Sequence, residues 1–93
     1  MAGRRRVTIV VHGQVQGVGF RHFIWRLARQ LRLDGEVRNR ADGAVAIQAA
    51  GEPAAVGMLI EAARRGPANA EVQELEVRED EGPEPEQGFR VTA

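Results

Sequence analysis

Apolar residues recur at helical spacing in two stretches of the chain. In residues 20–33 the i, i+3, i+4, i+7 pattern of a half-buried helix is formed by Phe20, Phe23, Ile24, Leu27, Ala28 and Leu31. The second stretch begins at Pro53, a residue suited to the first turn of a helix, and extends to about Arg65, before Gly66 and Pro67. Its apolar stripe consists of Val56, Leu59, Ile60 and Ala63. We therefore predict two amphipathic helices.

Short runs of strand-forming residues surround these helices. The clearest is residues 7–11, which His12 ends. Residues 36–40 and 44–48 predict two more strands, joined by a tight primed turn, because Asp42 followed by Gly43 tolerates positive φ angles. Residues 72–78 are a fourth candidate and residues 89–91 a short fifth one. The acidic segment 79–87 contains two prolines and is expected to be a mobile loop.

The predicted order of elements is βαββαβ, with the short fifth strand as an addition. Antiparallel strands with both helices on one face form a ferredoxin-like α/β sandwich of the α+β class. A chain of 93 residues builds one hydrophobic core. We expect a single domain over residues 1–93, with residues 1–5 as a flexible N-terminal tail. Many unrelated activities share this architecture, so the fold does not give the function.

Composition excludes several kinds of site. The chain has no Cys and no Lys, which excludes a disulfide framework, a thiolate metal site, a cysteine nucleophile and a P-loop or Schiff-base lysine. The net charge is zero, but residues 1–43 contain nine Arg and three carboxylates, whereas residues 44–93 contain four Arg and ten carboxylates. The basic half favours a negatively charged ligand.

The pattern also bears on location and assembly. No apolar run has the form of a signal peptide or the length of a membrane span. We therefore expect a cytoplasmic protein with no membrane partner. No extended apolar patch is visible in the pattern, so a monomer is expected.

Residues 13–21 (GQVQGVGFR) connect the first strand to the first helix and contain three glycines. Glycine lets the backbone turn sharply and bring its N–H groups close to a ligand, and the N-terminus of the helix that follows attracts anions. Arg21 adds a planar cation at the helix end where the dipole disfavours one, which indicates an anionic partner. A tight turn with no ligand is the alternative interpretation of the glycines alone.

Two common phosphate motifs do not fit this loop. A dinucleotide fingerprint needs a third glycine where His22 stands, and a Walker loop needs a lysine. His12 and His22 lack a third ligand for zinc, so we expect surface or packing roles for both.

Residues 13–21, with residues 33–39 (LDGEVRN) and 42–45 (DGAV), resemble the signature of the acylphosphatase family. The resemblance covers most of the chain. It implies the ferredoxin-like fold and hydrolysis of the carboxyl–phosphate bond of small-molecule acyl phosphates to a carboxylate and inorganic phosphate, with no metal and no cofactor. Inorganic phosphate or sulfate is then the expected product-like ligand.

The resemblance also implies roles for individual residues. Arg21 and Asn39 are the implied catalytic residues, with Asn39 orienting the attacking water. Backbone N–H groups of the loop are implied to hold the substrate phosphate, and they belong to Gln14, Val15, Gln16, Gly17, Val18 and Gly19.

The chain departs from the family pattern in two places. Glu36 occupies a position that is usually aromatic, which is expected to alter packing or electrostatics near Asn39. Residues 88–91 (GFRV) follow the family's last strand only loosely.

Two other functions remain as alternatives. The main one is a non-catalytic module that senses an anion on the same fold. The second is a nucleic-acid-binding domain that uses Arg4, Arg5 and Arg6. Because the aromatic strand motif of an RNA-binding sheet is missing, we expect no nucleic-acid partner and a solvated arginine tail.

Overall fold

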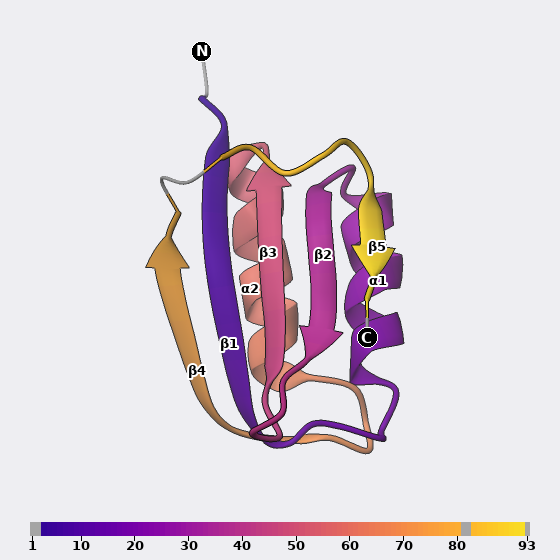
Figure 1. Ribbon diagram of the computed structural model, residues 1–93. Helices are drawn as coiled ribbons and strands as arrows, with labels where there is room; N and C mark the ends of the chain where they lie inside the picture. Colours follow the sequence, from indigo (N-terminus) through magenta and orange to yellow (C-terminus); the bar gives the residue numbers. More distant parts are fainter. Residues whose placement is uncertain (1–2, 81–82, 93) are drawn as a thin grey trace.

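The computed structural model describes residues 3–80 and 83–92, so the first two residues of the expected tail and residues 81–82 of the expected acidic loop lie outside the description. Five strands form one sheet, and both helices cover one of its faces (Figure 1). In chain order the elements are β1 (Arg5–Gln14), α1 (Phe20–Gln30), β2 (Asp34–Asn39), β3 (Val45–Gly51), α2 (Pro53–Arg65), β4 (Glu71–Glu79) and β5 (Phe89–Val91). The predicted βαββαβ order and the short fifth strand are confirmed.

The strands lie in the order β4-β1-β3-β2-β5. All neighbouring pairs are antiparallel except β2 and β5, which are parallel. The expected antiparallel pairing therefore holds for β1 to β4, and the short β5 makes the sheet mixed at this edge. The chain leaves β4 at one edge and crosses one end of the sheet, so that β5 runs in the direction of β2 at the other edge (Figure 1).

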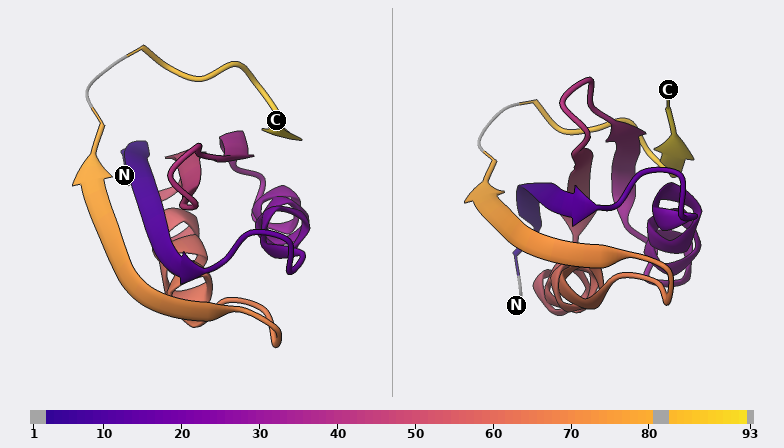
Figure 2. Two further views of the ribbon diagram at one scale, coloured as in Figure 1. Left: turned by 60° about the horizontal axis from the view of Figure 1, so that its bottom comes forward. Right: turned by 90° about the horizontal axis from the view of Figure 1, so that it is seen from below.

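The core lies between the sheet and the helices. Alternate residues of β1 point toward it, and Ile9 sits opposite Ile47 of β3 and Val77 of β4. On the helices, the side chains of Phe20 and Leu59 are almost fully buried. α1 packs on β2 and β5, while α2 packs on β1 and β4 (Figure 2). No helix in residues 3–80 and 83–92 is long and apolar enough to cross a membrane.

α1 ends at Gln30, three residues before the end of the predicted helix at residue 33. Arg32 adopts a left-handed conformation with φ 57°, and the N–H of Leu33 donates to the carbonyl of Ala28 at 2.9 Å. This geometry is a Schellman-type helix end, which usually carries glycine at the left-handed position. Leu31 and Leu33 still pack on or in the core, which explains why the stripe continues beyond the helix.

The turn between β2 and β3 also differs from the prediction. Gly43 has a positive φ of 95° and Asp42 does not, so this is no primed turn. The N–H of Arg40 donates to the carbonyl of Ala44 at 2.8 Å, which closes a three-residue loop with a left-handed glycine at its end. The N–H of Ala44 and the guanidinium of Arg40 lower the pKa of the Asp42 carboxyl below its usual value.

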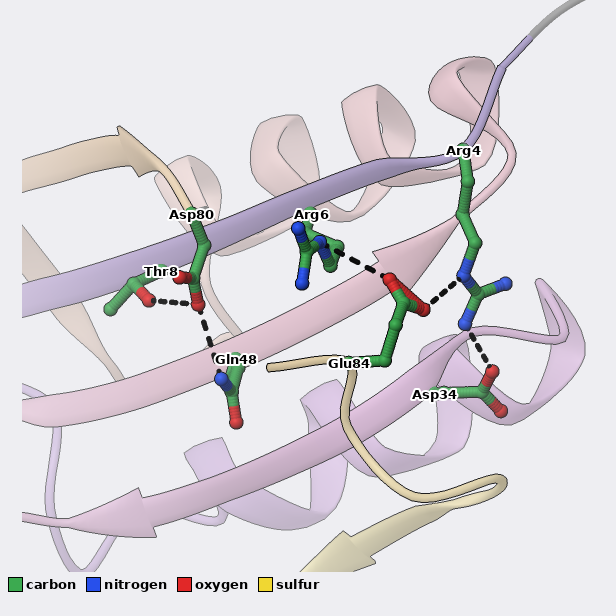
Figure 3. Close-up of polar contacts among 7 residues, drawn as sticks. All are labelled: Arg4, Arg6, Thr8, Asp34, Gln48, Asp80 and Glu84. Carbon is green, nitrogen blue, oxygen red and sulfur yellow. Dashed lines mark hydrogen bonds and ion pairs between the residues drawn. The ribbon is translucent and has the colours of Figure 1, made fainter. Parts of the chain in front are cut away.

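The N-terminal arginines are paired with carboxylates, where a solvated tail was expected. Glu84 accepts from Arg4 Nε at 2.6 Å and lies 3.1 Å from Arg6 Nε (Figure 3). Arg4 also donates to Asp34 at 2.6 Å, and Arg5, the first residue of β1, pairs with Glu79 at 2.9 Å. These contacts tie the described part of the acidic segment, which was expected to be mobile, to the end of the sheet.

The sheet face away from the helices has a polar cluster of its own. The carboxylate of Asp80 accepts from the Thr8 hydroxyl at 3.3 Å and from the Gln48 amide at 3.1 Å (Figure 3). These contacts join β1, β3 and the start of the acidic segment across the open face.

Candidate active site

Three connections gather at the end of the sheet where β1 ends: the β1–α1 loop, the β2–β3 turn and the chain between α2 and β4 (Figure 1). The β1–α1 loop consists of residues 15–19. Gly17 and Gly19 have φ angles of 74° and 81°, which L side chains rarely adopt. Gly19 is also the N-cap of α1. The two glycines therefore allow the loop to fold tightly over the first turn of α1.

Two side chains of the loop fix its position. Val15 is buried in the core with 1% of its surface exposed. The half-buried amide of Gln16 donates to the carbonyl oxygens of Arg40 at 2.8 Å and Ala44 at 2.9 Å. The loop is thus tied to the β2–β3 turn, and its shape does not depend on a ligand.

The loop and the start of α1 present unpaired backbone donors. Within residues 3–80 and 83–92, the N–H groups of residues 16–19 make no hydrogen bond. The first turn of α1 has no side-chain cap, and the first N–H groups of a helix have no partner within it. Together they form a concave set of donors suited to an anion.

Arg21 lies in the first turn of α1, and its guanidinium is oriented by Thr92, the residue after β5. Its Nη1 donates to the carbonyl of Thr92 at 3.1 Å. The N–H of Thr92 in turn donates to Val37 of β2 at 2.9 Å, so this carbonyl is held by the sheet. No carboxylate of the described residues pairs with Arg21, which leaves most of its N–H donors for a ligand.

Asn39 is the last residue of β2 and sits opposite Val45 of β3. It lies two positions after the buried Val37, so its side chain points to the helix-covered side of the sheet. The side chain is half-buried and makes no hydrogen bond within the described part of the chain. Its amide is therefore available to a water or ligand.

A cavity of about 390 Å³ unites these elements. It is lined by Val15, Gly17, Gly19, Phe20, Arg21, His22, Asn39 and Val91. Arg21 and Asn39, which are 18 positions apart in the sequence, thus border one volume beside the glycine loop.

The other predicted loop residues have different surroundings. Gln14 is exposed at the end of β1, and its backbone pairs with Glu71 of β4. Val18 packs against the edge of the core. For Gln16 only the backbone N–H was expected to contribute, but its side chain also ties the loop to the β2–β3 turn.

The contribution of β5 and of Thr92 after it was not predicted from the sequence. Val91 forms one wall of the cavity and Thr92 supplies the carbonyl that orients Arg21. The only signal was residues 88–91, read as a loose version of a last strand. A backbone carbonyl carries no side-chain signature, so the sequence did not indicate this contact.

Glu36 does not approach the cavity. It alternates with Val37 along β2 and lines a shallow depression on the open face with Thr8 and Arg38. Glu36 and Asn39 therefore lie on opposite faces of the sheet.

The two histidines have separate surroundings. His12 lies on the open face, 2.8 Å from a carboxylate oxygen of Glu76. His22 lines the cavity and stacks on Trp25, with ring centroids 5.5 Å apart. Trp25 donates its Nε1–H to the carbonyl of Phe89 at 3.1 Å. This contact joins α1 to β5, and the Arg21 contact joins α1 to the residue that follows β5.

The fold and the cavity together define an α/β sandwich whose β1–α1 loop presents unpaired backbone N–H groups at the start of its first helix. The family model described as acylphosphatase matches residues 7–91, and the chain belongs to the acylphosphatase family. It is 44% identical over 87 residues to an acylphosphatase of Salinibacter ruber, covering 94% of this chain and 92% of that one. It is 49% identical over 87 residues to one of Caldivirga maquilingensis, covering 92% of each.

Solved structures agree with this assignment. An acylphosphatase from Bacillus subtilis superposes with a TM-score of 0.89 at 36% identity, covering 95% of this chain and 98% of that one. The full-length HypF structure, in its phosphate- and nucleotide-bound form, has a TM-score of 0.86 at 27% identity. It covers all of this chain but 12% of the HypF chain, so the similarity concerns one part of that protein.

Proposed function

We propose that this acylphosphatase-family enzyme hydrolyses acyl phosphates by in-line attack of a water molecule at phosphorus. The water is oriented by Asn39, and the phosphate is held by backbone N–H groups of residues 14–19 and by Arg21. The observation that carries this proposal is that the loop, Arg21 and Asn39 border a single cavity.

The phosphate oxygens require positive partners in fixed positions. The unpaired N–H groups of the loop and of the first turn of α1 supply several donors, and Arg21 adds a cation whose fork matches two phosphate oxygens. Charge that develops on these oxygens in the transition state meets donors that are already in place. Such preorganised stabilisation is usually the largest contribution to catalysis.

Asn39 supplies the second function. Its amide has an acceptor and two donors, so it can hold a water molecule and aim a lone pair of that water at phosphorus. The P–O bond to the acyl oxygen breaks as the new P–O bond forms, and the leaving carboxylate takes the electron pair. A carboxylate is a good leaving group, so no strong general acid is needed. The proton of the attacking water passes to the phosphate oxygens.

Phosphoryl transfer of this kind depends mainly on positioning and charge stabilisation. A site of one guanidinium, one amide and a backbone loop is therefore sufficient. No observation favours the non-catalytic anion sensor over this enzyme.

Hydrolysis in ¹⁸O-labelled water tests the proposed step. Attack at phosphorus places the label in inorganic phosphate, whereas attack at the acyl carbon places it in the carboxylate. We expect the label in phosphate when benzoyl phosphate is turned over by the wild-type enzyme. Label in benzoate would contradict the proposal, and equally slow hydrolysis with and without enzyme would favour the anion sensor.

We also propose that the enzyme acts as a monomer in the cytoplasm. The absence of Cys suits a reducing compartment, and among the described residues the only large hydrophobic side chains that are well exposed are Met58 and Val91. Light scattering of the purified protein tests the monomer; a dimer mass at micromolar concentration would contradict it.

A further inference from the structure

A groove adjoins the cavity beside Arg21 and Asn39, which is called the phosphate cavity below. It has a volume of about 490 Å³ and runs between α1 and the C-terminal end of α2. Its lining residues are Gly19, His22, Phe23, Arg26, Leu27, Gln30, Ala62 and Arg65. Gly19 and His22 line both volumes, so the groove is continuous with the phosphate cavity.

The groove has an apolar floor and a cationic rim. Phe23 and Leu27 are half-buried and Ala62 is buried. Arg26 and Arg65 are exposed, and neither pairs with a carboxylate of the described residues. Exposed guanidinium groups beside an apolar floor favour a ligand that has an apolar body and an anionic end.

The neighbouring Arg64 provides a comparison for Arg65 in the groove. Arg64 and Arg65 both lie in the last turn of α2, where the helix dipole favours cations. Arg64, however, does not line the groove and lies 3.7 Å from Glu61. Of the two, only Arg65 lines the groove.

The geometry of attack directs the acyl group toward this groove. Asn39 and Val91 bound the phosphate cavity from β2 and β5, whereas the groove opens on a different side of the first turn of α1, toward α2. In an in-line displacement the attacking and leaving oxygens lie on opposite sides of phosphorus. A water held by Asn39 therefore places the leaving oxygen away from β2, where the groove begins.

We propose that this groove is the acyl-binding subsite and that it selects acyl phosphates whose acyl group carries a distal anionic group. The inference rests on the proposed function. The apolar part of the acyl group lies on Phe23 and Leu27, and its distal anion lies between Arg26 and Arg65. Arg26 is one helical turn beyond His22, about 6 Å along the helix axis, which is the length of a substituted benzoyl group.

A pair of substrates that differ only in the distal group tests the proposal. 4-Carboxybenzoyl phosphate carries the distal anion, and its rigid ring prevents the carboxylate from attacking its own acyl carbon. 4-Methylbenzoyl phosphate has a similar shape without the charge. We expect wild-type kcat/KM to favour the carboxylated substrate about threefold to tenfold at low ionic strength, and to lose this preference in high salt.

Three variants locate the effect. Arg26→Gln and Arg65→Gln should each lower the preference about twofold to fivefold, as expected for exposed ion pairs, mainly through KM. The matched control Arg64→Gln removes the same charge one position away and should leave the preference unchanged. Circular dichroism checks that each variant is folded.

The outcomes separate the two proposals. If wild type hydrolyses both substrates with equal kcat/KM at all salt concentrations, the acyl subsite is refuted and the proposed function stands. If Arg64→Gln lowers the preference as much as Arg65→Gln, the selectivity comes from net charge and the subsite is likewise refuted. If wild type hydrolyses neither substrate, the proposed function fails and the subsite fails with it.

Discussion

The amide of Gln16 is expected to hold the β1–α1 loop in the shape that the proposed phosphate binding needs. Its Nε2 makes two hydrogen bonds, at 2.8 Å and 2.9 Å, to the carbonyl oxygens of Arg40 and Ala44. Both carbonyls also accept backbone bonds, from Gly43 and Arg40 respectively. Gln16→Ala therefore leaves no carbonyl without a partner. The loss is limited to the two bonds, at about 1 kcal/mol each.

We therefore expect Gln16→Ala to lower the free energy of unfolding by about 1–2 kcal/mol and Tm by about 5–15 °C. The variant must order its loop when phosphate binds, so the Kd for inorganic phosphate should rise by up to about tenfold. Urea denaturation and calorimetric titration measure the two effects.

Gln73→Ala is the matched control, because Gln73 is an exposed strand residue whose amide makes only a 3.5 Å contact with Glu71. Its stability should stay within about 0.5 kcal/mol of wild type. A folded Gln16→Ala protein with wild-type phosphate affinity would show that the loop keeps its shape without this amide, and would refute the reasoning.

Three further substitutions test other parts of the account. Arg21→Ala should lower kcat/KM for benzoyl phosphate by about 10³-fold or more and weaken phosphate binding, and activity close to wild type would remove Arg21 from the site. Burial raises the pKa of Asp34, but hydrogen bonds from the N–H of Gly88 and from Arg4 outweigh it and lower that pKa. The stabilisation is thus present above the unfolded value of about 3.9 and is lost as pH falls through the folded pKa. In urea titrations Asp34→Asn should be less stable than wild type by about 1 kcal/mol at neutral pH, and the gap should close in acid; a gap independent of pH would contradict this. Arg32→Gly should raise the free energy of unfolding by about 0.5–1 kcal/mol, because glycine adopts the left-handed conformation without strain; a loss of stability would show that the Arg32 side chain contributes more than its backbone costs.

Patterns of side chains predicted most of the fold. The stripe from Phe20 gave the start of α1, and Pro53 and Gly66 gave both ends of α2. The end of α1 was not predictable, because Arg32 takes a conformation that a sequence normally marks with glycine. The direction of β5 depends on where the segment before it crosses the sheet. The three residues of β5 do not indicate that path, so its parallel pairing with β2 was not predictable.

The candidate site was likewise predictable from the sequence only in part. The glycines and Arg21 indicated an anion-binding loop from their chemistry, whereas Asn39 was singled out only through the family resemblance, since an asparagine at a strand end has many ordinary roles. The hydrogen bonds that position Gln16 and Arg21 are made to backbone carbonyls of Arg40, Ala44 and Thr92. Residue types do not specify such partners, and only the folded structure reveals them.

The most direct test of the account is to measure turnover and phosphate binding together in Asn39→Ala. If Asn39 only orients water, kcat for benzoyl phosphate should fall by about 10³-fold, while the Kd for inorganic phosphate stays within about threefold of wild type. Asn69→Ala, at an exposed position between α2 and β4, should match wild type in both measurements. Near-normal turnover in a folded Asn39→Ala protein would contradict the proposed mechanism.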